Sequence, residues 1–292
     1  MRLNPFNPND IRVEDQRGMR FPGGGGGKVG CGTLVIALIA AVIFGVDPGQ
    51  MIGGLQQVEQ QGAPADTGAG DTGGRTAAES CSVNQYSQES CAALASLDRT
   101  WQPVFQKAGI AFEQPKLVFY SRAGRSGCGA AQSAMGPFYC PADEGIYLDT
   151  SFYDELANRL GAGPGDFARL YVIAHEYGHH IQHLVGLDQQ VRSLQQRDRS
   201  AANSLQVRME LQADCYAGVW AGLNRDQIDA GDFEEGMKAA AAIGDDTLQQ
   251  NAGRQVNPES FTHGSSSQRM DALRLGMQSG DESQCDRYFQ MS

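Results

Sequence analysis

The sequence predicts an α+β protein that is mostly helical and contains a small antiparallel sheet. Apolar residues recur at helical spacing over residues 88–108, 166–186 and 204–223. Three short segments between residues 116 and 149 are rich in aromatic and branched side chains and are separated by glycine-rich turns, as strands are. A chain of 292 residues has room for one or two domains with a sizeable core.

The N-terminal part of the chain divides by composition into three segments. Residues 1–28 are polar and end in a run of glycines, which predicts a disordered cytoplasmic arm. Residues 29–46 carry no charge over 18 residues, near the lower limit for spanning a bilayer, and predict one transmembrane helix. Residues 47–79 have almost no large apolar side chain and predict a flexible linker. The folded domain is therefore expected over residues 80–292.

Charges around the apolar run predict its orientation. Basic residues precede the run and acidic residues follow it, so the positive-inside rule places the N-terminus in the cytoplasm and the domain outside. A cleaved signal peptide is the alternative, although the leading region is long and no small-residue cleavage site follows. The net charge is −11, and because residues 1–46 carry +2, the remainder carries −13. This balance argues against nucleic acid or anionic lipid as the main partner of the domain.

Six of the seven cysteines follow the apolar run. No Cys-x-x-Cys pair occurs, which argues against a zinc site of four thiolates and favours disulfides formed in an oxidising compartment. Among fifteen possible pairings, proximity in the sequence favours Cys81 with Cys91 and Cys128 with Cys140, which leaves Cys215 with Cys285. Six buried free thiols are the alternative.

The first half of the domain begins with a predicted helix over residues 88–108, which Pro103 is expected to kink or interrupt. Residues 116–121, 137–140 and 145–149 predict the strands of the small sheet, and residues 151–160 predict a helix.

The second half is predicted to be helical. Its main helix is expected to begin at Asp166 as N-cap and to end at Gly186, and Gly178 within it indicates that another group approaches closely. A polar stretch over residues 188–203 follows. Further helices are expected over residues 204–223 and over residues 233–243, the latter with Asp232 and Glu235 as a capping box. A last helix is expected to begin after residues 265–267 and to run to Gly280.

The main helix contains four of the five histidines, around a His-Glu-x-x-His motif. His175 and His179 are four residues apart, so both imidazoles lie on one helix face and can meet one metal ion, with Glu176 beside them. A solvated or core face is the alternative for a helical histidine pair, because two ligands alone do not make a site.

A catalytic zinc needs three protein ligands and one open position for water. Glu210, 31 positions after His179, is the candidate for the third ligand. Asp214 lies four residues later on the same face, where it can accept a hydrogen bond from the far nitrogen of a ligand histidine and fix its tautomer. A solvated acidic face is the alternative for this pair.

The same helix excludes one competing ligand set and contains two further histidines. An extended metzincin motif needs Gly at position 182 and His at position 185, but the chain has Gln182 and Val185, which excludes that class. His183 lies one turn beyond His179 and is expected to pack beside the ligands. His180 points about 100° away and is expected to be exposed or hydrogen-bonded elsewhere.

HEYGHH followed by ELQADCYAGVW resembles the gluzincin zinc metallopeptidases, and in particular a bacterial membrane-anchored family of neutral zinc metallopeptidases. RVEDQRG near the N-terminus, CGAAQSAMGPFYCPAD, YLDTSFYDEL and FTHGSSSQR are similar to the same family. The resemblance implies a zincin-like fold and one Zn²⁺ held by His175, His179 and Glu210. It also implies an inner-membrane protein with a periplasmic domain.

The resemblance also implies roles for the remaining site residues. Glu176 would act as general base in the hydrolysis of a peptide or protein substrate, and Asp214 would orient His175. His263, followed by Arg269, resembles the oxyanion-stabilising histidine of related gluzincins; capping or packing is the alternative, and Tyr216 is a weaker candidate for that role.

A second hypothesis is a membrane-tethered binding or scaffold protein that holds zinc structurally. A fourth protein ligand in the folded domain, such as His183 or a cysteine, would favour it.

Overall fold

The computed structural model describes residues 1–19 and 74–290. The predicted transmembrane helix and most of the predicted linker lie outside these residues. Within the described ranges, no helix is long and apolar enough to cross a membrane.

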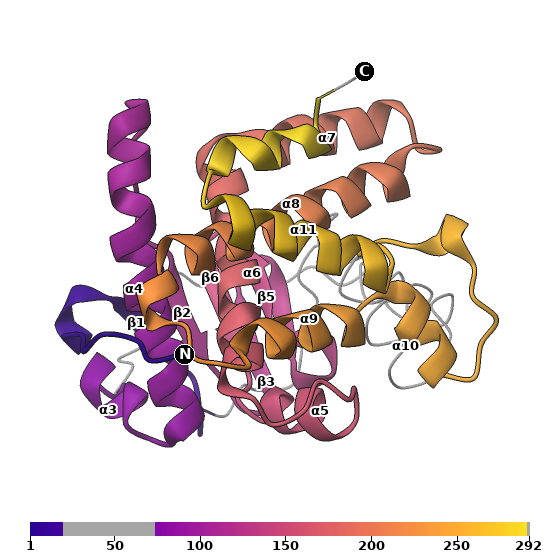
Figure 1. Ribbon diagram of the computed structural model, residues 1–292. Helices are drawn as coiled ribbons and strands as arrows, with labels where there is room; N and C mark the ends of the chain where they lie inside the picture. The colour runs from indigo at the N-terminus through magenta and orange to yellow at the C-terminus, as the bar shows by residue number, and fades with distance from the viewer. Residues whose placement is uncertain (20–73, 291–292) are drawn as a thin grey trace, which may run out of the picture.

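The described part of the chain is mostly helical, as predicted (Figure 1). Helix α6 runs through the centre of the molecule, with α4 on one side and α9 and α10 on the other. Pro103 lies inside α4, which continues past it, and α7 forms where only a polar stretch was expected. The helices are α3 (Ala77–Cys81), α4 (Gln85–Ala108), α5 (Phe152–Asn158), α6 (Asp166–Leu184), α7 (Leu187–Arg197), α8 (Ala202–Leu223), α9 (Asp232–Ala242), α10 (Asp245–Asn251) and α11 (Ser266–Ser279).

Within residues 1–19 and 74–290, the sheet has four strands in the order β1-β2-β6-β5. These are β1 (Arg12–Asp15), β2 (Lys116–Phe119), β6 (Gly145–Leu148) and β5 (Phe138–Cys140), and a separate hairpin consists of β3 (Ala123–Ser126) and β4 (Gly129–Gln132). The prediction of a wholly antiparallel sheet is wrong, because β1, β2 and β6 are parallel and only β5 is antiparallel. The chain between β2 and β6 is long enough for the crossover that two parallel strands need. Strand β5 comes just before β6 in the sequence and pairs with it in the antiparallel direction, on the side of β6 away from β2.

The prediction that residues 1–28 are disordered is wrong for residues 1–19. Strand β1 pairs with β2 in the register Val13↔Leu117, and Ile11 is buried in the main core. Asp15 is buried too, and its carboxylate accepts hydrogen bonds from the side chain of Arg17. Composition alone gave no sign of this order, because the arm is held by partners that lie about one hundred residues away in the sequence.

Two predicted helix starts differ in the structure. Asp166 is the first residue of α6 and not its N-cap, and its carboxylate contacts the α-amino group of Met1. Asp232 is likewise the first residue of α9, and no capping box forms there. Instead, Glu235 accepts a hydrogen bond from the backbone nitrogen of Phe167 at 3.1 Å. These carboxylates bind donors from segments that are distant in the sequence and adjacent in the fold, and the local sequence cannot show such donors.

Helices α6 and α8 pack closely, as Gly178 predicted. A Cβ atom at position 178 would lie 2.8 Å from the Cα of Ala213, so only glycine permits this approach. On the other side of α8, a Cβ atom at Gly276 would lie 2.0 Å from the carbonyl oxygen of Cys215. Helix α8 is thereby fixed between α6 and α11.

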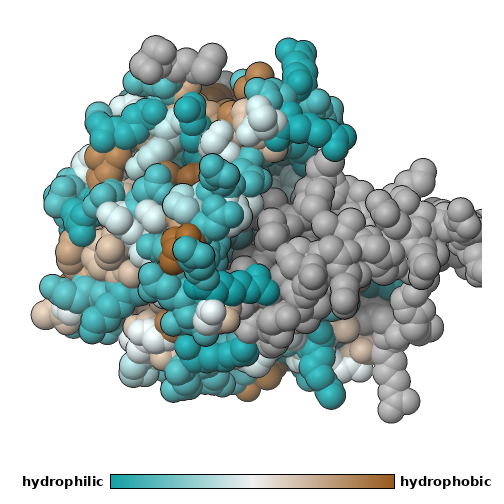
Figure 2. Space-filling view, turned by 90° about the vertical axis from the view of Figure 1, so that its right-hand side faces the viewer, coloured by the Kyte–Doolittle hydropathy of each residue, from teal (hydrophilic) through white to brown (hydrophobic). Residues whose placement is uncertain are grey.

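The three predicted disulfides are confirmed: Cys81–Cys91, Cys128–Cys140 and Cys215–Cys285. The third joins α8 to the C-terminal 3-10 helix η6 (Glu282–Tyr288). The face seen in Figure 2 is mainly hydrophilic where it is coloured, and its hydrophobic residues are scattered.

Candidate metal centre

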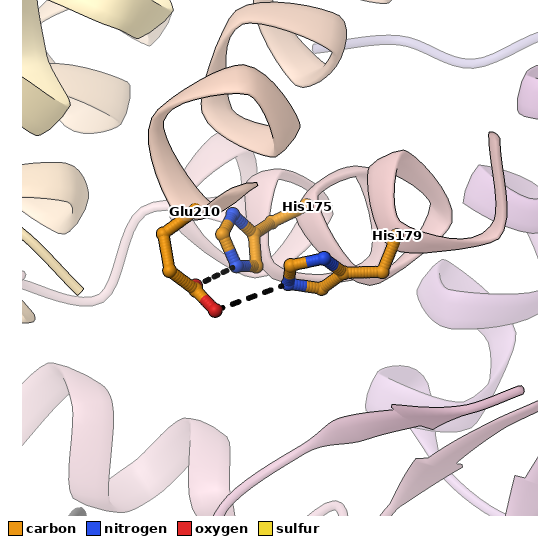
Figure 3. A group of neighbouring side chains, drawn as sticks. All are labelled: His175, His179 and Glu210. Atoms are coloured by element: carbon orange, nitrogen blue, oxygen red, sulfur yellow. Dashed lines mark hydrogen bonds and ion pairs between the residues drawn. The ribbon is translucent and has the colours of Figure 1, made fainter. Parts of the chain in front are cut away.

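The side chains of His175 and His179 on α6 and Glu210 on α8 converge at one point (Figure 3). Their ligand atoms all lie within 4.8 Å of one another. Nε2 of His175 is 3.1 Å from Oε2 of Glu210, and Nε2 of His179 is 3.6 Å from Oε1 of the same carboxylate. The structure therefore brings together the three predicted ligands, with their donor atoms facing one another.

Local packing explains this convergence. His175 and His179 lie one turn apart on α6, and the intervening Gly178 lets α8 approach at Ala213. Glu210 lies almost one turn before Ala213 on α8, so the same contact that joins the helices brings its carboxylate to the two imidazoles.

Burial and neighbouring charges act in opposite directions on the ligands. Burial lowers the pKa of His175, but the charge and hydrogen bond of Asp214, with a hydrogen bond to Glu210, raise it to about 10. Burial raises the pKa of Glu210, yet the charge of His179 and hydrogen bonds to both imidazoles hold it well below its usual range. Because a metal binds the unprotonated imidazole, protons and metal compete for these nitrogens.

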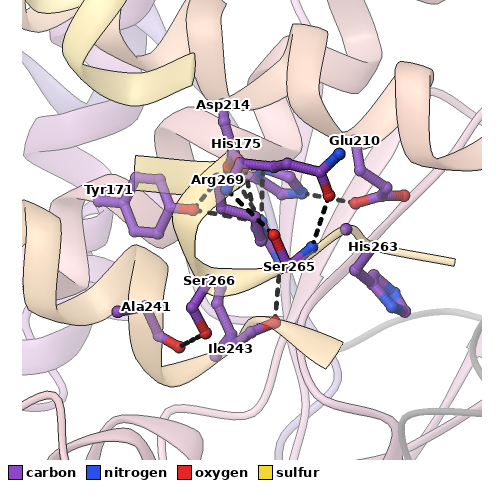
Figure 4. A network of polar contacts seen from close by, with 12 residues as sticks. Tyr171, His175, Glu210, Asp214, Ala241, Ile243, His263, Ser265, Ser266 and Arg269 are labelled. Carbon is purple, nitrogen blue, oxygen red and sulfur yellow. Dashed lines mark hydrogen bonds and ion pairs between the residues drawn. The ribbon is translucent and has the colours of Figure 1, made fainter. Parts of the chain in front are cut away.

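Asp214 lies behind His175 in a buried polar network (Figure 4). Nδ1 of His175 is 2.7 Å from Oδ1 of Asp214, the contact expected from the sequence. Asp214 also accepts hydrogen bonds from Tyr171 at 2.6 Å and from Nε and Nη2 of Arg269 at 2.8 and 2.9 Å. Burial raises the pKa of Asp214, but Arg269 and His175 lower it to about 2. Asp214 is therefore held as a carboxylate, which fixes Nε2 of His175 as the nitrogen that faces the centre.

A pocket of about 220 Å³ opens onto the three ligands. Glu176 and His263 line it together with His175, His179 and Glu210. Most of the remaining wall is apolar and includes Met135, Phe138, Phe152, Leu160, Val191, Ile243 and Leu248. The three predicted ligands thus lie at the wall of a largely apolar cavity.

Glu176 and His263 both lie at the wall of this pocket. Glu176 is only 8% exposed and lines the pocket beside the ligand pair. Nδ1 of His263 is 3.2 Å from Oδ1 of Asp245, so its Nε2 is the nitrogen left for the pocket. Tyr216 lies elsewhere: its ring packs against Trp101 at a centroid distance of 5.5 Å, and it does not line the pocket.

Comparisons with known proteins give a family and several relatives. The sequence profile of the family described as "Putative neutral zinc metallopeptidase" matches residues 6–288. The chain belongs to this family. The matched range includes β1 and every residue of the centre. A relative in Escherichia coli (strain K12), "Uncharacterized protein YpfJ", is 46% identical over 275 residues, covering 93% of this chain and 89% of that protein.

A more distant relative is "Uncharacterized protein Rv2575" of Mycobacterium tuberculosis (strain ATCC 25618 / H37Rv). It is 38% identical over 269 residues, covering 85% of each chain. No solved structure matches the chain.

The family description implies zinc, and the residues fit that metal. Two imidazoles and one carboxylate form a donor set found in catalytic zinc sites, and all three donors can face a common point. Each histidine is held through its other nitrogen, which is typical of zinc ligands.

The other histidines of α6 do not join the centre. His180 is fully buried; its Nε2 is 2.8 Å from the carbonyl oxygen of Glu113 and its Nδ1 is 3.0 Å from the hydroxyl of Tyr139. Of the two expectations for His180, exposure is wrong and hydrogen bonding elsewhere is confirmed. Burial lowers its pKa to about 4, so its ring is neutral. His183 contacts Asp188 at 3.0 Å. In the described ranges all six cysteines form disulfides, and no fourth protein ligand meets the three.

Proposed function

We propose that the chain is a zinc-dependent peptidase of the gluzincin type. The observation that carries the proposal is that the two histidines and Glu210 lie at the wall of a pocket that also contains Glu176. Within the described ranges no fourth protein side chain meets these ligands, so a position stays open for water or substrate. A scaffold with a structural zinc would need that position to be filled by the protein.

Each residue has a distinct task in this proposal. When bound, zinc supplies an activated water and polarises the scissile carbonyl. Glu176 accepts the proton of the attacking water and passes it to the leaving amine. His263 donates a hydrogen bond from Nε2 to the developing oxyanion. Asp214 holds the ring of His175 in the orientation that directs Nε2 to the centre.

The substrate proposed is an extended stretch of peptide or protein. Strand β5 is one of the two edge strands of the sheet in the described ranges, and Pro137, Phe138, Tyr139 and Pro141 in and around it line the pocket. An extended peptide can add to such an edge through its backbone hydrogen bonds. The apolar wall of the pocket favours a hydrophobic side chain next to the cleaved bond.

We also propose that residues 29–46 attach the protein to a membrane, because their uncharged composition favours hydrocarbon over water. The attachment would hold the peptidase near substrates at the membrane.

The experiment that tests the proposal uses the full-length chain, since β1 belongs to the domain and a fragment from residue 80 would lack it. We expect about one zinc per chain, because two histidines and one glutamate are a complete set of protein ligands for a catalytic zinc. We also expect cleavage of an unstructured protein, because the open fourth position can hold the attacking water. Chelation should abolish cleavage, and zinc, but not magnesium, should restore it, because these nitrogen ligands do not suit magnesium.

Two variants of α6 provide the matched comparison. His179→Ala should lose zinc and activity, whereas His183→Ala, one turn further along the same helix and outside the ligand group, should keep both. A zinc-loaded protein without any cleavage would contradict the peptidase proposal, and a native chain without zinc would contradict the site.

A further inference from the structure

Gln182, which the sequence singled out only as a departure from the metzincin motif, contacts a proposed zinc ligand. Its side chain is fully buried on α6. Its Oε1 is 2.9 Å from Nδ1 of His179. Its Nε2 donates to the carbonyl oxygen of Met209 at 2.8 Å and to Oε1 of Gln212 at 2.9 Å. The amide thus connects His179 to the residue that precedes Glu210.

The orientation of this amide follows from its partners. A backbone carbonyl can only accept, so the group that faces Met209 must be the NH₂ of Gln182. Oε1 then faces His179, and because an amide oxygen can only accept, Nδ1 of His179 must carry the hydrogen. Nε2 of His179 is left with its lone pair directed at the centre.

Gln212 extends the same chain of hydrogen bonds. Its Nε2 donates to the carbonyl oxygen of Cys285 at 3.3 Å, which leaves its Oε1 to accept from Gln182. Both glutamines are buried and away from water. The carbonyl oxygens of Met209 and Cys285 therefore determine which group donates in each of these hydrogen bonds.

We propose that Gln182 is the positioning residue for His179, as Asp214 is for His175, and that it fixes the tautomer and ring orientation needed to bind zinc. The inference rests on the proposed zinc site. The two ligand histidines then differ: a carboxylate lies behind His175 and a neutral amide behind His179. The neutral partner limits the negative charge placed around the metal by Glu210 and Asp214.

The test compares Gln182→Met with Gln212→Met in the full-length protein. Met keeps the approximate volume of Gln and removes the amide. Gln182→Met should weaken zinc affinity by about 10- to 100-fold, the usual effect of losing the partner of a ligand histidine. Gln212→Met should weaken it far less, because Met209 still orients Gln182.

Zinc affinity is measured by competition with a chelator, and the visible spectrum of the cobalt-substituted protein reports ligand geometry. The melting temperature of the zinc-free proteins separates a general loss of stability, which both variants share, from the effect on the site. Unchanged zinc affinity in Gln182→Met, or an equal loss in Gln212→Met, would overturn the proposal. Neither readout needs peptidase activity, so the test can succeed or fail independently of whether the chain cleaves peptides.

A second inference comes from β1. Besides its pairing with β2, this strand is followed by Gln16, whose backbone nitrogen donates to the carbonyl oxygen of Phe119 at 2.7 Å. The side chain of Arg17 donates to the carbonyl oxygen of Ser80 and to the hydroxyl of Ser87, both at 2.8 Å. Residues 1–19 are thus an integral part of the domain that contains the metal centre.

We infer that residues 1–19 and residues 74–290 lie on the same side of the membrane. The apolar run of residues 29–46 connects them in the sequence, and one crossing would place its two flanks on opposite sides. Its 18 residues are too few to cross a bilayer twice as helices, since each crossing needs about 20. This inference replaces both the predicted cytoplasmic arm and the predicted single crossing by residues 29–46, which would then attach to the membrane without crossing it. The three disulfides favour an extracytoplasmic location for both parts.

The test uses two variants, one with a cysteine at the exposed position Asn9 and one with a cysteine at the exposed position Gln250. Both carry Cys31→Ser, because Cys31 is the one cysteine outside the three disulfides and would otherwise react as well. Intact cells are treated with a maleimide that cannot cross the inner membrane. Equal labelling of both positions, or equal protection of both until the membrane is permeabilised, supports a shared compartment. Labelling of Gln250→Cys with protection of Asn9→Cys would overturn it.

Discussion

Glu176→Gln is expected to retain one zinc per chain and to lower kcat for peptide hydrolysis by at least about 100-fold. The side chain lies in the pocket wall beside His175 and His179, but the group that can hold the metal consists of His175, His179 and Glu210. Gln has the same shape as Glu and cannot accept the proton of the attacking water. General-base catalysis typically contributes about 10²- to 10⁴-fold to the rate, and this contribution should be lost.

Steady-state kinetics and metal analysis of the same preparation check this prediction. His263→Ala is the comparison variant, because its ring lines the pocket and is tied to Asp245 rather than to the ligands. It should lower kcat by about 100-fold, the usual effect of losing one oxyanion donor, with zinc content unchanged. Undiminished hydrolysis by Glu176→Gln would contradict the mechanism, whatever the behaviour of His263→Ala.

The strongly periodic helices and the positions of β2, β5 and β6 could be predicted from the sequence, whereas β1 and the parallel pairing of β1, β2 and β6 could not. Helices α6 and α8 are long, and their spacing and Gly178 anticipated the contact between them. Strand β1 has only four residues, two of them acidic, and its partner lies about one hundred residues away. Local composition predicts disorder for such a segment, because the stabilising partner is absent from any short window of sequence.

The candidate site, too, could be predicted only in part from the sequence. His175, His179, Glu210 and Asp214 could be proposed because a four-residue spacing on a helix fixes which side chains share a face. Gln182 lies three residues after His179 on the same face, so its position was available from the sequence. Its role depends on the carbonyl of Met209, which only the packing of α8 against α6 supplies. No separate role was predicted for Arg269, and the structure places its guanidinium on Asp214.

This position of Arg269 leads to the second large effect. Arg269 is 2% exposed, and besides Asp214 its guanidinium contacts the hydroxyl of Tyr171 at 3.1 Å and the carbonyl oxygen of Ile243 at 3.2 Å. Arg269→Met removes the only cationic partner that Asp214 has in the described part of the chain, apart from a protonated His175. Leaving a buried charge wholly unpaired costs about 3–5 kcal/mol. In the zinc-free protein the protonated His175 still contacts Asp214 at 2.7 Å, so the free energy of unfolding should fall by less than that amount but by more than about 1 kcal/mol.

Denaturant unfolding of the zinc-free protein with its disulfides intact measures this change. Arg274→Met is the matched control on the same helix, since Arg274 pairs with the exposed Asp271, and its cost should stay below about 1 kcal/mol. Combining Arg269→Met with Asp214→Asn should cost less than the sum of the two single changes, because the double variant leaves neither charge unpaired. Strictly additive losses would show that Arg269 and Asp214 act independently. A smaller loss in the double variant would show that Asp214 needs Arg269 to stay buried as a carboxylate, so that the residue that orients His175 depends on the same ion pair that stabilises the fold.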